Sequence, residues 1–325
     1  MGYLAGETIL DDEYNTFVNS STSPFGYNHF AGTGSTVYGL GQTHIPTVTA
    51  GHSTITAAQW NTLLTGIDNI ANHANDSMTT RTQVTAGDPI KIKAAVAADL
   101  ASLAAEVAGG CTSATALETS SALRTSSAGS AWSQSHVVEH AVTFANADRM
   151  RHFFNGGGKV RVVADRTGNG GTDGAANTKD ADWTTLLAAV GNFDINALTS
   201  TRSGSGETLT TDGLANGFHD LSTGYTVLIK LTADSSPYTD NYAQIEAKLN
   251  AAVGTGVTIT VKYSIIDAGA DATYTANNLS SIDQTPDRVG VTRVRLYTLT
   301  PDDTQGLAAD LAVASTAETS NTTTT

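Results

Sequence analysis

The sequence predicts an α+β protein that is mainly β, with an extended N-terminal arm, a two-helix segment and then a β-sandwich-like body with short helices. Two patterns lead to this prediction. Long runs of apolar residues at spacings of three and four, typical of amphipathic helices, fall between residues 53 and 110. Between residues 132 and 300, short runs instead alternate apolar and polar side chains, as half-buried strands do.

The composition bounds the class of protein. The chain has 325 residues, which corresponds to about two domains, and 40% of them are hydrophobic, enough for a packed core. Only 15% are charged and the net charge is −14, so we expect no nucleic-acid partner. The single Cys111 excludes an intramolecular disulfide framework. The first residues lack a basic leader and no apolar run reaches about 18 residues, so we expect no signal peptide and no membrane partner.

Residues 1–52 show little periodicity and are rich in Gly, Ser and Thr, so we predict an extended arm. Its single aromatic residues are candidate interface residues: Phe25, Tyr27, Phe30 and Tyr38. In one interpretation they anchor the arm in pockets of a neighbouring subunit. The alternative is a surface loop packed on the chain's own core.

Residues 53–110 are predicted to form a helical hairpin or docking segment. A capping box, Thr56 with Gln59, marks the start of a helix over 56–75. Asp88 and Pro89 mark the start of a second helix over about 89–108. The predicted core residues of these two helices are Trp60, Leu64, Ile67, Val96, Leu100 and Leu103. Residues 111–131, rich in Ser, Thr and Ala, are predicted to be a linker.

Residues 140–164 are predicted to form a strand, a short helix, a glycine turn and a second strand. The core candidates in this stretch are Phe144, Met150, Phe153 and Phe154, of which the last three share one helix face. The basic residues here are candidates for a contact with another subunit: Arg149, Arg151, Lys159 and Arg161. A solvated outer face is the alternative.

The remaining body, up to residue 300, combines one further helix with several strands. The helix is predicted over about 182–190, with Trp183 and Leu187 in the core. The predicted strands are 193–200, 206–211, 224–232, 242–249, 256–266 and 291–299. Residues 301–325 form an acidic and then Ser/Thr-rich tail, which we expect to be ordered only if neighbouring molecules hold it.

Two motifs suggest chemistry, and neither fits its context. The segment from His136 to His140 matches H-x-x-E-H, a zinc-protease pattern that requires a helix. Here the surrounding sequence predicts a strand, which would place the two histidines roughly 13 Å apart, so we expect two exposed strand histidines. The loop Asp165–Asp173 only partly resembles a calcium-binding loop, and a solvated turn is the alternative. We therefore expect no catalytic residue, no metal and no cofactor, and no enzyme.

An ordered series of segments over roughly residues 55–300 resembles a family of structural proteins from tailed bacteriophages, as found in phages of marine and photosynthetic bacteria. The segments are ITAAQWNTLLTGI (55–67), VTAGDPI (84–90), VTFANADRMRHFFNGGGKVRV (142–162), DWTTLLAAVGNF (182–193), GFHDLSTGY (217–225), YTDNYAQIEAKLNAA (238–252) and VTITVKYSIID (257–267). The family usually has an Ala within the glycine turn, where this chain has Gly156, Gly157 and Gly158.

The resemblance implies a virion structural protein without catalytic residues. The expected place is the tail, at the baseplate, tail tip or fibre-attachment region, and the alternatives are a head-decoration, neck or head-fibre protein. The implied partners are other virion proteins and copies of the chain itself, as a homo-oligomer. A module that binds host-surface glycan is a further alternative. The implied location is the virion, assembled in the host bacterial cytoplasm.

Overall fold

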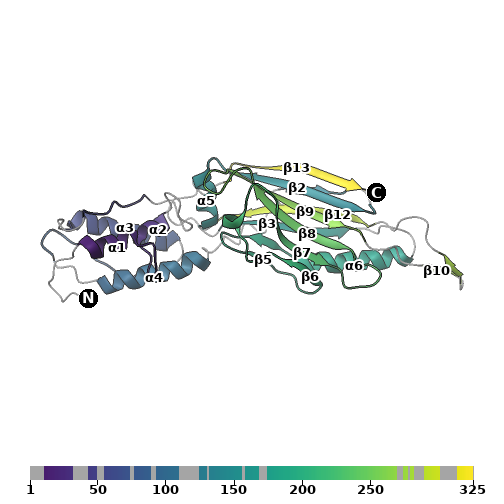
Figure 1. Cartoon of the computed structure of the whole chain (residues 1–325), viewed down its shortest axis with the longest axis horizontal. Coiled ribbons are helices and arrows are strands. Elements are labelled where there is room, and N and C mark those ends of the chain that lie inside the picture. Colours follow the sequence, from purple (N-terminus) through teal and green to yellow (C-terminus); the bar gives the residue numbers. More distant parts are fainter. Residues whose placement is uncertain are drawn as a thin grey trace. The chain divides into compact units, whose positions relative to one another are not determined.

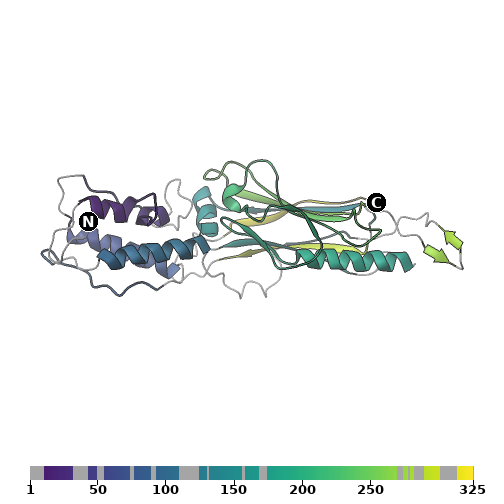
Figure 2. The same ribbon diagram turned by 60° about the horizontal axis from the view of Figure 1, so that its bottom comes forward.

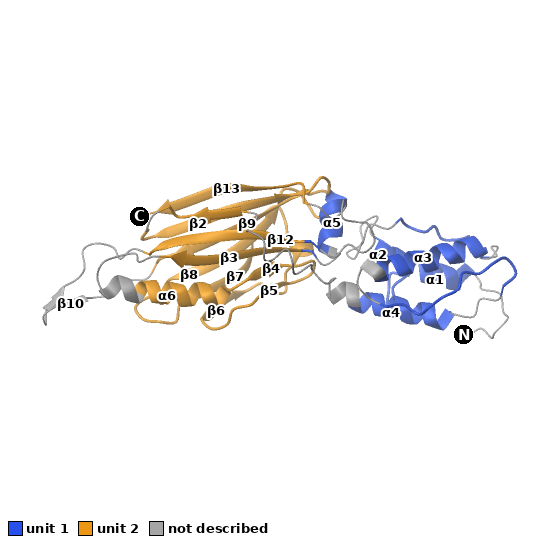
Figure 3. Cartoon of the chain, turned by 180° about the vertical axis from the view of Figure 1, so that it is seen from behind, with its two compact units in different colours: residues 1–114, 147–158, 300–312 blue, residues 115–146, 159–299, 313–325 orange. Residues whose placement is uncertain are grey.

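A computed structural model shows an α+β protein that is mainly β, as the sequence predicts (Figure 1). It describes residues 11–31, 43–49, 55–73, 77–88, 93–109, 124–129, 132–155, 158–167, 174–268, 274–276, 279–281, 289–300 and 313–324. The chain divides into two compact units, coloured separately in Figure 3. The helical unit comprises residues 1–114, 147–158 and 300–312, and the sandwich unit comprises residues 115–146, 159–299 and 313–325.

The helical unit has one apolar core formed by four helices. The helices of this unit are α1 (Asp11–Asn19), α2 (Tyr27–Ala31), α3 (Ala57–His73), α4 (Lys93–Gly109) and α5 (Ala147–Asn155). The first four pack against one another, and their buried residues form a single cluster that includes Trp60 and Leu100. The predicted capping box starts α3: the Gln59 N–H donates to Thr56 Oγ1 (3.2 Å), and the Thr56 N–H donates to Gln59 Oε1 (2.9 Å).

The prediction of an extended arm is wrong for residues 11–31, which form α1 and α2. Tyr27 and Phe30 are buried in the core of their own unit, and Phe25 packs partly against it. Helices this short are marginal on their own, so burial of their aromatic side chains against α3 stabilises them, a contact that local periodicity does not reveal. Tyr38 lies outside the described residues.

The sandwich unit consists of two antiparallel sheets and a helix that contacts both of them. The five-stranded sheet has the order β1-β12-β3-β4-β5, and the six-stranded sheet has the order β13-β2-β9-β8-β7-β6. The strands of the first sheet are β1 (Arg124–Ser127), β3 (Lys159–Thr167), β4 (Phe193–Ile195), β5 (Ser200–Arg202) and β12 (Val291–Leu299). Those of the second are β2 (Ser135–Thr143), β6 (Thr208–Asp212), β7 (Thr226–Thr232), β8 (Tyr242–Leu249), β9 (Thr258–Ile266) and β13 (Ser315–Thr324). The short β10 (Tyr274–Ala276) and β11 (Leu279–Ser281) pair with each other.

Strand alternation builds the interior of the sandwich. In β9, Ile259, Val261, Tyr263 and Ile265 are buried while Thr260 and Lys262 between them are partly exposed, as predicted for a half-buried strand. Helix α6 (Gly174–Val190) contacts β3 of one sheet and β7 and β8 of the other. Figure 2 shows α6 running along the direction of the strands. The helix is longer than predicted, and its Trp183 and Leu187 are buried.

Three boundaries differ from the predicted ones because long-range pairing decides them. The predicted linker 111–131 contains β1, which pairs with β12. The predicted tail 301–325 contains β13, which pairs with β2 along nearly its whole length (yellow in Figure 1). The predicted strand 193–200 is divided into β4 and β5, which pair with each other as a hairpin. The local sequences are polar or short, so only the partner strand identifies them.

The remaining predicted elements lie where the sequence places them. Residues 140–164 form β2, α5 and β3 in that order, and β8, predicted as a strand over 242–249, has these bounds. All the predicted core residues are buried: Trp60, Leu64, Ile67, Val96, Leu100, Leu103, Phe144, Met150, Phe153, Phe154, Trp183 and Leu187.

Candidate binding surfaces

Three asparagines hold extended segments of the chain against the helices of the helical unit. The Asn28 side-chain amide donates to the Ile45 carbonyl (2.9 Å), and its oxygen accepts the Ile45 N–H (2.9 Å). Asn15 makes the same pair of bonds with Val48, and Asn61 makes it with Val84. Each side chain therefore forms the two hydrogen bonds that a neighbouring strand would form with one residue, and at Ile45 the satisfied backbone groups are buried.

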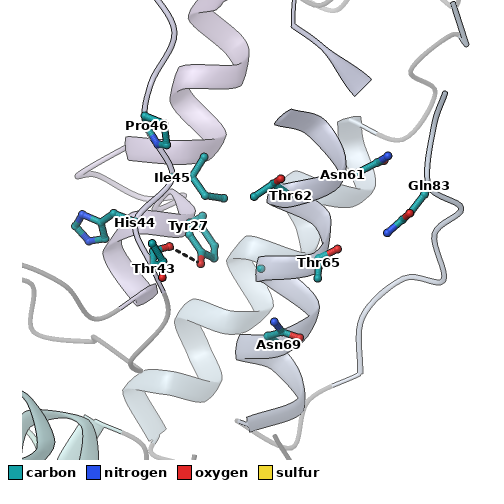
Figure 4. A pocket seen from close by; sticks show the side chains of 11 residues that line it. Tyr27, Thr43, His44, Ile45, Pro46, Asn61, Thr62, Thr65, Asn69 and Gln83 are labelled. Carbon is teal, nitrogen blue, oxygen red and sulfur yellow. Dashed lines mark hydrogen bonds between the residues drawn. The ribbon is translucent and has the colours of Figure 1, made fainter. Parts of the chain in front are cut away.

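A pocket of about 440 Å³ lies between one of these segments and α3 (Figure 4). Its lining residues are Tyr27, Thr43, His44, Ile45, Pro46, Asn61, Thr62, Thr65, Gly66, Asn69 and Gln83. Thr62, Thr65 and Asn69 come from α3, and the Tyr27 hydroxyl donates to the Thr43 carbonyl (2.9 Å). The close contact of Tyr27 with α3 depends on Gly66, because a Cβ there would lie 2.5 Å from the tyrosine ring.

The chemistry of this pocket is neutral and polar. Most of the lining residues have a hydroxyl or amide side chain, and none of them is an aspartate, glutamate, lysine or arginine. Burial raises the pKa of Tyr27 to about 12, so its hydroxyl stays protonated at ordinary pH. Such a lining can exchange hydrogen bonds with an uncharged polar ligand, and His44 is the one lining residue with a basic side chain.

The predicted basic contact surface is partly neutralised within the chain. Arg161 forms a two-point ion pair with Asp194 (2.6 and 2.9 Å). Arg151 is buried and pairs with Asp148 (3.0 Å). These two side chains are therefore held by their own chain, contrary to the idea of a free basic face, because strand and helix neighbours supply carboxylates. Arg149 and Lys159 are partly exposed, and their contact with another subunit stays a prediction.

Arg161 also borders a hollow of about 270 Å³ on the five-stranded sheet. The residues around it are Arg161, Val163, Asn192, Arg295, Tyr297 and Leu299. Arg293 and Arg295 both pair with Asp165, so this carboxylate neutralises arginines of the sheet rather than a cation bound in the loop. Asp173, at the other end of the loop considered for calcium, lies outside the described residues.

The strand prediction for His136 and His140 is confirmed, and the expectation that these side chains are exposed is wrong. Both lie on the inward face of β2 and are fully buried. Burial lowers the pKa of His136, and lowers that of His140 to about 4, so both imidazoles are neutral near pH 7. The local alternation of the sequence predicts which residues share a face. It does not show that polar partners in the opposite sheet allow the two histidines to be buried.

A chain of hydrogen bonds crosses the sandwich at His136. The Trp132 indole N–H donates to Thr292 Oγ1 (2.9 Å), which lies 2.6 Å from His136 Nδ1. His136 Nε2 lies 3.1 Å from Asn321 Oδ1 in β13. The arrangement is satisfied if Thr292 donates to Nδ1 and the Nε2–H donates to Asn321, so His136 is a structural link between sheets.

Ser126, His140 and Glu318 meet nearby, but not as a catalytic triad. The Ser126 hydroxyl donates to the Glu318 carboxylate, and its oxygen lies 2.8 Å from His140 Nε2. A triad needs the histidine between the serine and the acid, ready to take the serine proton. Here the serine is in the middle and is buried, so the group joins β1, β2 and β13 and presents no nucleophile.

These features define a β-sandwich unit with a polar interior link and a helical unit with a neutral pocket. Among the described residues, no group of three or more His, Cys, Asp or Glu side chains is placed to hold a metal ion. None of the described helices combines the length and apolarity needed to span a membrane. No protein-family model, no curated protein and no solved structure matches the chain.

Proposed function

We propose that this chain is a structural component of a phage virion, placed in the tail at the baseplate, tail tip or fibre-attachment region. It acts by protein–protein assembly, with copies of itself and with other virion proteins. Support comes from the ordered series of segments over residues 55–300 that resembles phage structural proteins. In the sandwich interior, Ser126 forms a hydrogen bond with His140, and His136 forms one with Thr292. Polar side chains that are paired within the chain suit a scaffold.

The structural observation that carries the proposal is the outer edge of β13. This ten-residue strand ends the six-stranded sheet, and no described strand pairs with its far side. Its only charged side chain is Glu318, and it contains no Lys or Pro. Soluble monomers usually protect such an edge with charge or proline. In β13, Arg124 donates to the Thr316 carbonyl near one end, but residues 319–324 carry no charge, which suits strand addition by another copy or a neighbouring protein.

The test locates the protein on the particle. Antibodies against the full chain should label purified particles at the tail in electron microscopy. Labels on the head or neck would overturn the tail position and favour the head-decoration, neck or head-fibre alternative. If the chain stays in the lysate supernatant and no particle is labelled, the virion role fails.

A charged substitution tests the role of the β13 edge in assembly. Thr323→Lys places a cation on the exposed edge strand, and Thr210→Lys makes the matched change on β6, at the opposite edge of the same sheet. Incorporation into particles should fall for Thr323→Lys alone. Equal incorporation of both variants would contradict assembly through β13.

The neutral pocket of the helical unit supports one second candidate, a module that binds host-surface glycan. Hydroxyl and amide side chains match the groups of an uncharged sugar. Thr65→Trp should fill the pocket and remove binding of the full chain to host polysaccharide, measured by calorimetry. Thr185→Trp, an exposed site on α6, is the control. Absence of binding by the unaltered chain would reject this candidate.

A further inference from the structure

A lysine and an aspartate are buried together in the sandwich unit. Lys179 Nζ on α6 lies 2.7 Å from Asp267 Oδ2, and each side chain is 1% exposed. Asp267 directly follows β9, and its N–H donates to the Gln134 carbonyl (2.8 Å) beside the start of β2. Helix and sheet therefore hold the amine and the carboxyl group in contact from two separately anchored elements.

A second acid lies beside this pair. Asp182 is three residues after Lys179 on α6, so it is on the same side of the helix, and both of its carboxylate oxygens are buried. Burial raises its pKa to about 6, and the negative charges of Glu207 and Asp267 add to this effect while a hydrogen bond from Ser235 opposes it. The Asp182 carboxyl group therefore keeps its proton to a higher pH than an exposed aspartate does.

The pair differs from the other ion pairs that the structure describes. The other well-buried pairs contain arginine, whose guanidinium keeps its proton and cannot act as a nucleophile. The other lysine pairs, Lys93 with Glu13 and Lys262 with Glu246, are partly exposed to water. Two charges as deeply buried as Lys179 and Asp267 carry a large desolvation cost, which favours transfer of the proton from the ammonium to the carboxylate. The neutral form of the pair, an amine in contact with a carboxylic acid, is the form that can react.

We propose that Lys179 and Asp267 join in an intramolecular isopeptide bond. The Lys179 Nζ lone pair attacks Asp267 Cγ, the C–N bond forms, and the C–O bond to the hydroxyl group breaks. One amine proton passes through the Asp182 carboxyl group to the departing oxygen, which leaves as water. The reaction is a condensation that needs no oxidant, reductant or further reactant, and Asp182 ends as it began.

Two physical terms favour the bond. Fixed contact between the groups replaces a bimolecular encounter and supplies an effective concentration of about 10⁵ M or more when the orientation is right. The amide also removes two charges from a site that water does not reach. The bond would join α6 covalently to the end of β9. It would thereby strengthen the sandwich unit against mechanical force.

Mass spectrometry of the intact denatured chain tests the proposal. The chain should weigh less than its sequence by the mass of one water, and a tryptic digest should contain one branched peptide that joins Lys179 to Asp267. A chain of full sequence mass without this peptide overturns the proposal, whatever the variants do.

The variants assign the roles. Lys179→Arg and Asp267→Leu should restore the full mass, whereas Lys262→Arg, a matched change at a partly exposed pair, should keep the bond. Asp182→Asn should keep the ion pair in place but lose the bond. If the bond forms in Asp182→Asn, the role of Asp182 is overturned. Circular dichroism confirms that each compared variant is folded.

Discussion

Asn28 binds Ile45 through two hydrogen bonds, each 2.9 Å long, with its amide as donor and its oxygen as acceptor. This relationship fixes residues 43–49 beside the helices and forms one wall of the neutral pocket. Asn15 and Asn61 make equivalent pairs, so one device, repeated three times, replaces strand pairing in a unit whose described elements are helical. The stability of the helical unit therefore depends on side-chain amides as well as on its apolar core.

Asn28→Asp should destabilise the helical unit by about 1–3 kcal/mol, because the new carboxylate cannot donate to the Ile45 carbonyl and is buried. Hydrogen exchange at the Ile45 amide measures the effect locally, and its protection should fall. Asn61→Asp, at a partly exposed site, is the comparison and should change the protection of Val84 less. Unchanged exchange at Ile45 would contradict the role of Asn28.

Gly66→Ala should destabilise the helical unit by about 1–3 kcal/mol, although alanine favours helix formation, because the added Cβ would meet the Tyr27 ring at 2.5 Å. Thr65→Ala, one residue earlier on the exposed side of α3, should be neutral or slightly stabilising. Urea unfolding followed by helical circular dichroism compares the two variants. A Gly66→Ala chain as stable as the Thr65→Ala chain would show that Tyr27 moves away without cost.

Stability should depend on pH through His140. Its pKa is about 4 in the folded chain and 6.5 ordinarily, so between these values the unfolded chain binds a proton that the folded chain does not. The free energy of unfolding should therefore rise from about pH 4 to pH 6.5, by at most about 3 kcal/mol from this group. Asp182 acts in the opposite direction between pH 3.8 and about 6, because its folded-state pKa is raised.

The His140→Gln variant separates these two contributions. It removes the titrating imidazole and leaves Asp182 in place. Guanidinium unfolding at several pH values should show that the stability difference between the unaltered chain and this variant grows as pH rises from about 4 to 6.5. Parallel curves would mean that His140 does not titrate between the folded and unfolded states in this range.

Removal of residues 313–325 should open the edge of β2, because β13 provides its outer partner. His136 would lose Asn321, and Ser126 would lose Glu318, so both histidines would gain contact with water. Their pKa values should rise toward the ordinary 6.5, which an NMR titration of the imidazole signals measures. Histidine signals that titrate as in the full chain would contradict the structural role of β13.

Much of the fold could be predicted from local patterns. The alternation in β8, β9 and β12 identifies these strands, and the Thr56–Gln59 capping box identifies the start of α3. The candidate surfaces were harder to predict. The aromatic side chains of Tyr27 and Phe30 are buried rather than presented to a neighbour. The paired asparagines are isolated polar residues whose partners lie 17 to 33 residues away.

The sequence by itself determined the α+β class, the predicted core and the strand at His136 and His140, because helix and strand periods are local properties. Only the tertiary structure decided that the polar C-terminal segment is a strand, that both histidines are buried, and that Lys179 meets Asp267. The physical reason is the same in each case. A polar segment or a charge is stable in a buried position only when a partner distant in the sequence completes its hydrogen bonds. No local pattern identifies that partner.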